Sequence, residues 1–170
     1  MINSFRGDNG YLSNFWDCTV VYNGRTYRNS ESAYQAQKFL HEYIQAQFGA
    51  TSGSEAKALA KTLKHDMRKD WHQVNLGFMC EIVHAKFTQN KSLRELLMTT
   101  YPQQLTEGNY WHDSFWGVCD GIGQNWLGRI LMAERIYWLD LTCQDRYKDD
   151  RLVLSFEAWQ RTQISMSTPI

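Results

Sequence analysis

The sequence predicts a helix-rich α+β fold in a single domain, with a small antiparallel hairpin or sheet. The chain has 170 residues and is 43% hydrophobic, which suits one domain with a substantial core. Apolar residues recur at helical spacing over most of the chain. The strongest hairpin signal is the dipeptide Asn23-Gly24 near the N-terminus, and no internal repeat stands out.

A hairpin and a run of helices are predicted in order. Residues 18–22 and 25–27 are the strands, because Asn23 and Gly24 both tolerate a positive φ. Pro102 ends the fourth helix, since its ring cannot continue the turn. The predicted helices cover residues 30–49, 54–64, 66–87, 90–101 and 126–139, with Asn90 and Asn125 as caps, a loop over residues 107–124 and a late strand over residues 151–159.

Composition narrows the function classes. Lys and Arg total 18, as do Asp and Glu, so no global field draws the chain to duplex nucleic acid or an anionic membrane. The four cysteines are scattered without a C-x-x-C pair, which favours free thiols in a reducing compartment. No apolar run approaches the length of a membrane span. We expect a soluble cytoplasmic protein.

The first predicted helix carries the most informative stretch of the sequence. Glu31, Tyr34, Gln35 and Lys38 share one face at about 100° per residue, and this polar face is suited to hold a ligand. The opposite face is predicted to be apolar and carries Ala33, Ala36, Leu40, Tyr43 and Ile44.

Glu31 lies in the first turn of this helix, which Ser30 or Asn29 caps. The positive end of the helix dipole favours an ionised carboxylate there, and such a group suits a nucleophile, a base or a stabiliser of positive charge. A carboxylate placed for the dipole alone is the competing interpretation. Lys38 lies about 10 Å further along the axis, too far for a direct ion pair but suited to grip the far side of one ligand. Lys38 is alternatively an amine that attacks an opened sugar, if its pKa is depressed, or a solvated lysine.

The loop over residues 110–125 is a second candidate site. Its glycines allow close backbone approach, and free amides at the start of the next helix favour an anion such as phosphate; a purely structural loop is the alternative. Glu31 and Asp113 together suit a ribosyl bond, with Glu31 stabilising or attacking the sugar carbon and Asp113 orienting or deprotonating water. The residues of interest in the loop are Asp113, Trp116, Gly117, Asp120, Gly121, Gly123 and Asn125.

Two further groups carry weaker signals. Arg68, at a predicted helix start, is suited to clamp a phosphate, and Trp71 either lies beneath a ring or enters the core. Cys80 and His84 are four residues apart on a predicted helix, a spacing that can present two metal ligands. No second pair of ligands accompanies them in the sequence, so we expect no metal site.

The chain resembles the NADAR, or YbiA-like, N-glycosidase family from about residue 2 to residue 137. It departs from the family at Ser32, where a histidine is usual, and at Ala33, where an aromatic residue is usual, which implies a wider pocket. The motifs that carry the resemblance are Tyr11-Leu12-Ser13-Asn14-Phe15; Ser30-Glu31 with Gln35-Ala36-Gln37-Lys38-Phe39, similar to the family's E-H-x-x-Q-A-x-K-F; Arg68-Lys69-Asp70-Trp71; Met79; Lys86-Phe87; Leu105 and Glu107; Asp113 with Trp116-Gly117; and Asn125-x-Leu127-Gly128 with Leu131-Met132 and Arg135.

The resemblance implies that residues 1–140 form an N-glycosidase domain, and that residues 141–170 are an extension packed on this domain or continuing it. It implies hydrolysis of N-glycosidic bonds without a metal or other cofactor. Family substrates include ribosylamino-pyrimidine phosphates of the riboflavin pathway and ADP-ribose attached to guanine. The expected partner is therefore a small nucleotide-like substrate or a modified nucleobase within nucleic acid. A module that binds ADP-ribose or nucleotides without cleaving them is the alternative.

Family function attaches to the positions of Glu31, Asp113 and Trp116. Trp116, with Phe15 or Tyr34, is expected to stack on a base. The expected phosphate ligands are Arg68, Lys38 and the loop amides. The other candidate binding residues are Asn14, Trp71, Gly117, Gly123 and Asn125.

Overall fold

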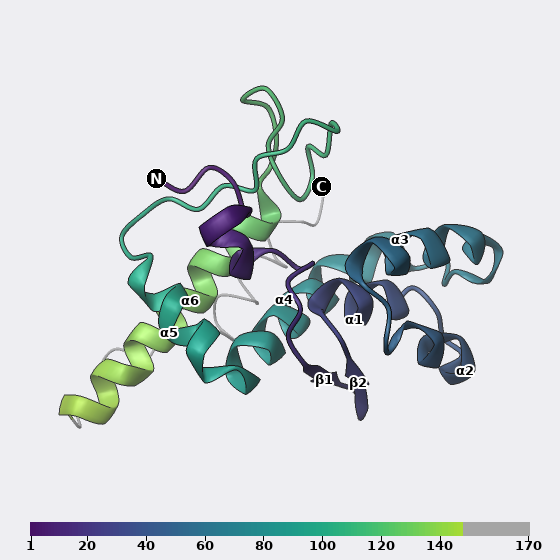
Figure 1. The fold of residues 1–170 in the computed structure, drawn as a ribbon, viewed down its shortest axis with the longest axis horizontal. Coiled ribbons are helices and arrows are strands. Elements are labelled where there is room, and N and C mark those ends of the chain that lie inside the picture. Colours follow the sequence, from purple (N-terminus) through teal and green to yellow (C-terminus); the bar gives the residue numbers. More distant parts are fainter. Residues whose placement is uncertain (148–170) are drawn as a thin grey trace, which may run out of the picture.

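The computed structural model describes residues 1–147, which contain six α-helices, three short 3₁₀ helices and one two-stranded sheet joined by loops (Figure 1). This confirms the predicted helix-rich α+β fold with a small hairpin. The elements in order are η1 Gly7–Leu12, β1 Val20–Tyr22, β2 Arg25–Tyr27, α1 Ser30–Ala36, α2 Glu42–Gln45, η2 Ala46–Phe48, α3 Gly53–Thr62, η3 Lys64–Asp66, α4 Trp71–Gln89, α5 Lys91–Thr99 and α6 Trp126–Tyr147.

The hairpin forms at its predicted place. Val20 lies opposite Tyr27 in an antiparallel ladder, and Asn23 and Gly24 adopt φ values of 48° and 72°. Two consecutive positive φ values match the right-handed twist of the strands, which is why this dipeptide is such a strong turn signal. The predicted late strand over residues 151–159 lies outside the described residues, while α6 runs past residue 140 to Tyr147.

The prediction of one helix over residues 30–49 is wrong, because α1 ends at Ala36. The chain then bends so that Phe39 pairs with Met67 in an antiparallel bridge, and Arg68 N–H donates to Lys38 O at 2.8 Å. Phe39 is 1% exposed and stacks on Phe48 with ring centroids 5.6 Å apart. Burial of this ring among residues distant in sequence outweighs the gain from continuing a helix.

The predicted apolar face and the predicted start of the third helix also differ from the structure, because of the same bend. Leu40 and Tyr43, expected on the apolar face, are 67% and 68% exposed because they follow the bend. The predicted helix over residues 66–87 begins later, at Trp71, since Met67 is extended in its bridge to Phe39. Asn90 precedes α5 but makes no capping bond; its side chain donates to backbone carbonyls instead.

Helix α4 runs through the middle of the molecule, where it contacts α1, α5, α6 and β1 (Figure 1). One buried cation on α4 organises the N-terminal segment. Lys86 is 1% exposed, and its Nζ donates to Tyr11 O at 2.7 Å and to Ser13 O at 2.8 Å. Burial lowers the pKa of Lys86 to about 8. These bonds tie the end of η1 to the core, and so place the residues that follow it beside α1.

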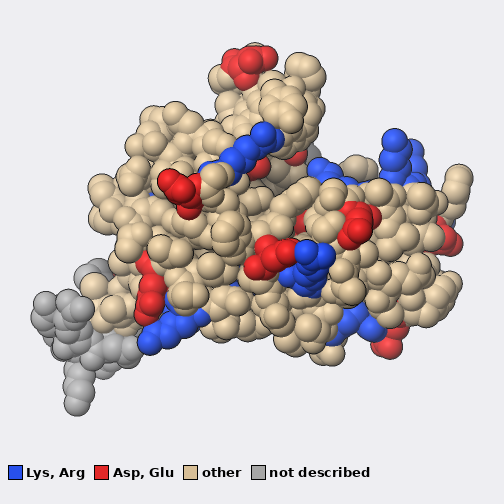
Figure 2. All heavy atoms as spheres, in the orientation of Figure 1, with Lys and Arg blue, Asp and Glu red and all other residues tan. Residues whose placement is uncertain are grey.

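The surface agrees with the balanced composition. On the face drawn in Figure 2, Lys and Arg atoms are interspersed with Asp and Glu atoms. Within residues 1–147, no helix combines the length and the apolar character that crossing a membrane requires. Each of the four cysteines, all in the described part of the chain, is a free thiol.

Candidate active site

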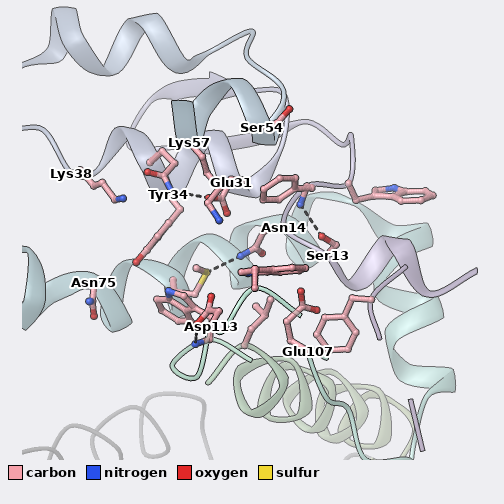
Figure 3. Close-up of a pocket in the computed structure, with 18 of the residues that line it drawn as sticks. Ser13, Asn14, Glu31, Tyr34, Lys38, Ser54, Lys57, Asn75, Glu107 and Asp113 are labelled. Carbon is pink, nitrogen blue, oxygen red and sulfur yellow. Dashed lines mark hydrogen bonds between the residues drawn. The ribbon is translucent and has the colours of Figure 1, made fainter. Parts of the chain in front are cut away.

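A cavity of about 870 Å³ lies between the N-terminal segment, α1, the start of α3, the start of α4 and the loop that precedes α6. Figure 3 shows the polar side chains that these separate segments direct toward it. The predicted residues that line it are Asn14, Phe15, Glu31, Tyr34, Lys38, Trp71, Asp113 and Trp116. The fold therefore brings together the polar face of the first helix and the loop, the two candidate sites of the sequence.

Glu31 sits in the wall of this cavity and is 7% exposed. Asn29 is the residue that caps α1, since its side chain accepts from Ser32 N–H. Gln35 Nε2 donates to Glu31 Oε1 at 2.7 Å, and Glu31 N–H donates to Asn14 O. Burial nevertheless raises the pKa of Glu31, against the lowering effects of Gln35 and two nearby lysines. Desolvation thus outweighs the lowering of the Glu31 pKa that the helix dipole was expected to cause.

Asp113 enters the cavity from the loop, and backbone N–H groups of the same loop hold its side chain. Its Oδ1 accepts from Phe115 N–H at 3.1 Å and from Trp116 N–H at 2.9 Å. Asn109 bonds both the N–H and the C=O of Asp113. The Trp116 indole packs edge-on against Tyr34, with ring centroids 5.5 Å apart. The loop is therefore positioned by short-range bonds and by contact with α1.

Glu107 is a third carboxylate at the cavity, which the sequence showed only as part of the family resemblance. Burial raises its pKa to about 7, and the nearby Asp113 and Glu31 contribute in the same direction. Its Oε2 is buried and finds no hydrogen-bond donor among residues 1–147. No local pattern marks Glu107, because what distinguishes it is burial beside residues from other parts of the chain.

Three basic side chains line the cavity together with the three carboxyl groups. Lys38 Nζ lies 5.6 Å from the centre of the Trp71 ring, and burial lowers the Lys38 pKa. Lys57, from α3, lies 5.7 Å from the centre of the Phe15 ring. Arg6 also lines the cavity. Lys57 and Arg6 were not predicted from the sequence, since neither belongs to a motif and only the fold brings them to the cavity.

Four predicted binding residues lie outside this cavity. Arg68 pairs with Asp70 through two bonds of 2.6 and 2.8 Å. A Cβ at Gly117 would lie 2.2 Å from Glu107 O, so this glycine permits close approach within the loop. A Cβ at Gly123 would likewise lie 2.1 Å from Gly117 O.

Asn125, like these two glycines, holds the loop in shape and does not line the cavity. It adopts a positive φ of 55°, and its side chain accepts from Glu107 N–H at 3.0 Å and donates to Leu105 O at 2.8 Å. Instead of capping α6 with its side chain, Asn125 fastens the segment that carries Glu107 to the start of that helix. The orientation of Glu107 therefore depends on Asn125.

Ser32 and Ala33, the two departures from the family pattern, lie on the side of α1 that faces away from the cavity. The Ser32 hydroxyl lies 2.9 Å from Asn29 Oδ1 and 2.8 Å from Thr51 O, and Ala33 is fully buried. Neither residue lines the cavity. The small side chains at these positions therefore form no part of the cavity wall, and a pocket wider than is usual in the family stays a prediction.

Two amide side chains that line the cavity, like Glu107, carry a buried oxygen without a hydrogen-bond donor among residues 1–147. Asn14 Oδ1 and Gln35 Oε1 are buried acceptors that find no hydrogen-bond donor within the described part of the chain. Unpaired buried acceptors are costly, and they are common where a ligand supplies the missing donors. A ligand with several O–H or N–H groups matches this wall of the cavity.

A cavity in which carboxylates, cations and aromatic faces converge is typical of an enzyme active site, and the N-glycosidase relatives of this chain place it in the class of enzymes. The chain belongs to the NADAR domain family, whose family model matches residues 3–136. It is 35% identical over 130 residues to N-glycosidase YbiA of Escherichia coli strain K12, covering 75% of this chain and 81% of YbiA. The solved NMR structure of E. coli YbiA superposes with a TM-score of 0.72 at 30% identity, covering 89% of this chain and 92% of that chain.

A second relative is the riboflavin biosynthesis protein VVA0006 of Vibrio vulnificus strain YJ016. It is 37% identical over 130 residues, which cover 75% of this chain but 35% of the Vibrio protein. The chain therefore spans about a third of that relative. N-glycosidase Npun_R5314 of Nostoc punctiforme is 34% identical over 131 residues, covering 74% of this chain and 83% of that protein.

Proposed function

We propose that this protein is an N-glycosidase that hydrolyses the bond between a ribosyl phosphate, or an ADP-ribosyl group, and a nitrogenous base. The observation that carries the proposal is the convergence of Glu31, Glu107 and Asp113 on one cavity with aromatic walls. The E. coli and Nostoc relatives are named N-glycosidases, which supports the same chemistry.

The cavity offers a partner for each part of such a substrate. Trp116 and Tyr34 provide flat faces for a base. Lys38 and Lys57 are placed to neutralise phosphate, whereas Arg68 does not line the cavity and is paired with Asp70. The unpaired acceptors of Asn14 and Gln35 suit the hydroxyl groups of ribose.

The proposed reaction divides the work among the three carboxyl groups. Glu107, protonated up to about pH 7, gives its proton to the base nitrogen as the C1–N bond breaks and its electron pair leaves with the base. Glu31, in its ionised form, stabilises or attacks the sugar carbon as positive charge develops there. Asp113 accepts a proton from the water that adds to that carbon, so the products are the free base and the sugar with a C1 hydroxyl.

No step of this reaction uses a metal ion. Turnover should therefore persist when a chelator is added to the assay.

Lys38 offers a second route to the same products. Its depressed pKa makes a neutral amine more accessible, and this amine can attack C1 of a ring-opened sugar to form an imine with loss of the base. Water then hydrolyses the imine. Borohydride reduction during turnover distinguishes the routes, because it links the sugar covalently to Lys38 only if the imine forms.

The direct test is to incubate the protein with ADP-ribosylated guanosine and, separately, with a ribosylamino-pyrimidine phosphate, and to follow both products by chromatography. Release of base and sugar from either compound would support the proposal and identify the substrate branch. Binding without cleavage of either would instead support the nucleotide-recognition module. Since Ser32 lies away from the cavity, this departure from the family gives that alternative no structural support.

Glu107→Gln should lower kcat by about 10²-fold and remove one limb of the pH profile. A general acid must hold its proton, so the unmodified protein should lose activity as pH rises through about 7. The variant has no proton to lose there, and its residual rate should stay flat over the same range. Exposed Glu42 supplies the control, since Glu42→Gln should keep both the rate and the pH profile. An unchanged basic limb in Glu107→Gln would exclude Glu107 as the acid.

Gly53→Ala should raise KM by about 2- to 10-fold with little change in kcat, which corresponds to the loss of one ring contact. A Cβ at Gly53 would lie 2.6 Å from Cγ of Phe15, so this ring must move from the cavity wall. Gly77→Ala is the matched control, because a Cβ at Gly77 meets nothing within 4 Å. Steady-state kinetics on all three proteins would refute a role for Phe15 if Gly53→Ala left KM unchanged.

A further inference from the structure

The loop before α6 carries a cluster of metal-ligating side chains that lies outside the cavity. Cys119 Sγ lies 3.7 Å from His112 Nδ1 and 3.6 Å from Asp120 Oδ2, and the ligand atoms of all three residues lie within 4.8 Å of one another. None of these three residues lines the cavity. The proposed glycosidase reaction assigns this cluster no part.

The two distances from Cys119 Sγ match the ligand spacing in the coordination shell of zinc. With Zn–S bonds of about 2.3 Å and Zn–N or Zn–O bonds of about 2.0 Å, neighbouring ligands of a tetrahedral ion lie roughly 3.5 Å apart. The two distances from Cys119 Sγ are within about 0.2 Å of that value. A thiol is a weak hydrogen-bond donor, so hydrogen bonding alone gives little reason for an imidazole and a carboxylate to converge on it.

The backbone holds the Cys119 side of the cluster in place. Cys119 and Ile122 exchange two N–H to O=C bonds of 2.9 Å each, and Asp120 and Gly121 between them have φ values of 51° and 79°. This is a two-residue turn with positive φ at both central residues. It fixes Asp120 beside Cys119 before any ion binds.

The His112 side is held independently. His112 has a φ of 61° and precedes Asp113, whose N–H and C=O are both bonded by the Asn109 side chain. Asn109 N–H in turn donates to Val118 O at 2.9 Å, which joins the two arms of the loop next to Cys119. The three ligand groups thus come from two arms that are already tied together.

We propose that His112, Cys119 and Asp120 form a binding site for Zn²⁺ or a similar borderline-soft divalent cation. On binding, Cys119 loses its thiol proton to solvent, and the thiolate and the Asp120 carboxylate together balance the two positive charges of the ion. Water occupies the fourth position. The sulfur ligand disfavours Mg²⁺ and Ca²⁺, which prefer oxygen.

The position of the proposed metal site determines what ion binding would do to the loop. His112 is the residue before Asp113, so an ion that joins it to Cys119 and Asp120 closes a ring across the loop that carries Asp113 and Trp116. The ion would restrict this loop without touching the substrate. The Cys80 and His84 pair is less suited to bind a metal ion. Burial raises the Cys80 pKa to about 12, which disfavours the thiolate, and His84 bonds Glu134.

The test is a titration of the metal-free full chain with Zn²⁺ by calorimetry and with Co²⁺ by absorption spectroscopy. We expect one ion per chain, a dissociation constant of micromolar or tighter, and a thiolate-to-cobalt charge-transfer band. His112→Asn and Asp120→Asn should each weaken binding by 10-fold or more, while Asn tolerates the positive φ at both positions. Cys119→Ser should abolish the charge-transfer band.

Cys143→Ser is the matched control, because Cys143 is an exposed free thiol elsewhere on the chain and its loss should leave binding unchanged. The melting temperature of each metal-free variant shows that it is folded. Failure of the folded unmodified protein to bind either ion would overturn the proposal, and so would a charge-transfer band that survives Cys119→Ser. Neither result depends on substrate, so the outcome is separate from that of the glycosidase assay.

Discussion

Glu31→Gln should reduce kcat by about 10⁴-fold while the protein remains folded. The substitution keeps an oxygen in the position that accepts from Gln35 Nε2, so the hydrogen bond in the wall of the cavity can persist. What is lost is the negative charge that meets the developing positive charge at the sugar carbon. Because Glu31 is buried and its pKa is raised, losing this charge should leave the melting temperature unchanged or raise it.

Glu42→Gln is the control for this experiment, since Glu42 also lies in the first turn of a helix but is exposed. Single-turnover rates, melting temperatures and ligand affinities should be measured on all three proteins. If Glu31→Gln retained most of its rate, the carboxylate mechanism would fail. If it bound substrate normally without cleaving it, Glu31 would be placed in the chemical step and not in recognition.

Asp113→Asn should lower kcat by about 10³-fold with a smaller change in KM. Asp113 Oδ1 accepts from two backbone N–H groups, and an amide oxygen can accept the same bonds. The loop should therefore keep its shape, and the effect should isolate the loss of a group that can take a proton from water. The measurement is steady-state kinetics together with the near-UV circular dichroism of the neighbouring Trp116.

Asp66→Asn is the matched control, because Asp66 is exposed and lies in the short helix η3, away from the cavity. A change in the near-UV spectrum of Asp113→Asn would show that the loop had moved and that the rate loss was structural. An unchanged spectrum with an unchanged rate would remove Asp113 from the mechanism.

Features set by neighbours in sequence were predictable. The hairpin at Asn23-Gly24 formed because both turn residues accept a positive φ whatever surrounds them. The face shared by Glu31, Tyr34 and Gln35 follows from helical periodicity, and all three line the cavity. The family was also recognisable, since its motifs are short and occur in order.

Features set by distant neighbours were not predictable. The end of α1 at Ala36 depends on the burial of Phe39 against Phe48 and on its bridge to Met67. The contribution of Lys57 to the cavity depends on the packing of α3 against α1. None of these contacts leaves a periodic or spaced signal in the chain.

The protonation of the site shows this division most clearly. Local sequence places Glu31 at a helix start and there favours its ionised form. Burial by the N-terminal segment, α3 and the loop acts against that effect by raising the Glu31 pKa, and it raises the Glu107 pKa to about 7. Local geometry depends on residues a few positions apart and can be inferred from the chain, whereas desolvation depends on which distant segments cover a side chain. Which carboxylates form the site could therefore be inferred from the sequence. Their pKa values depend on the tertiary structure, because desolvation by distant segments sets them.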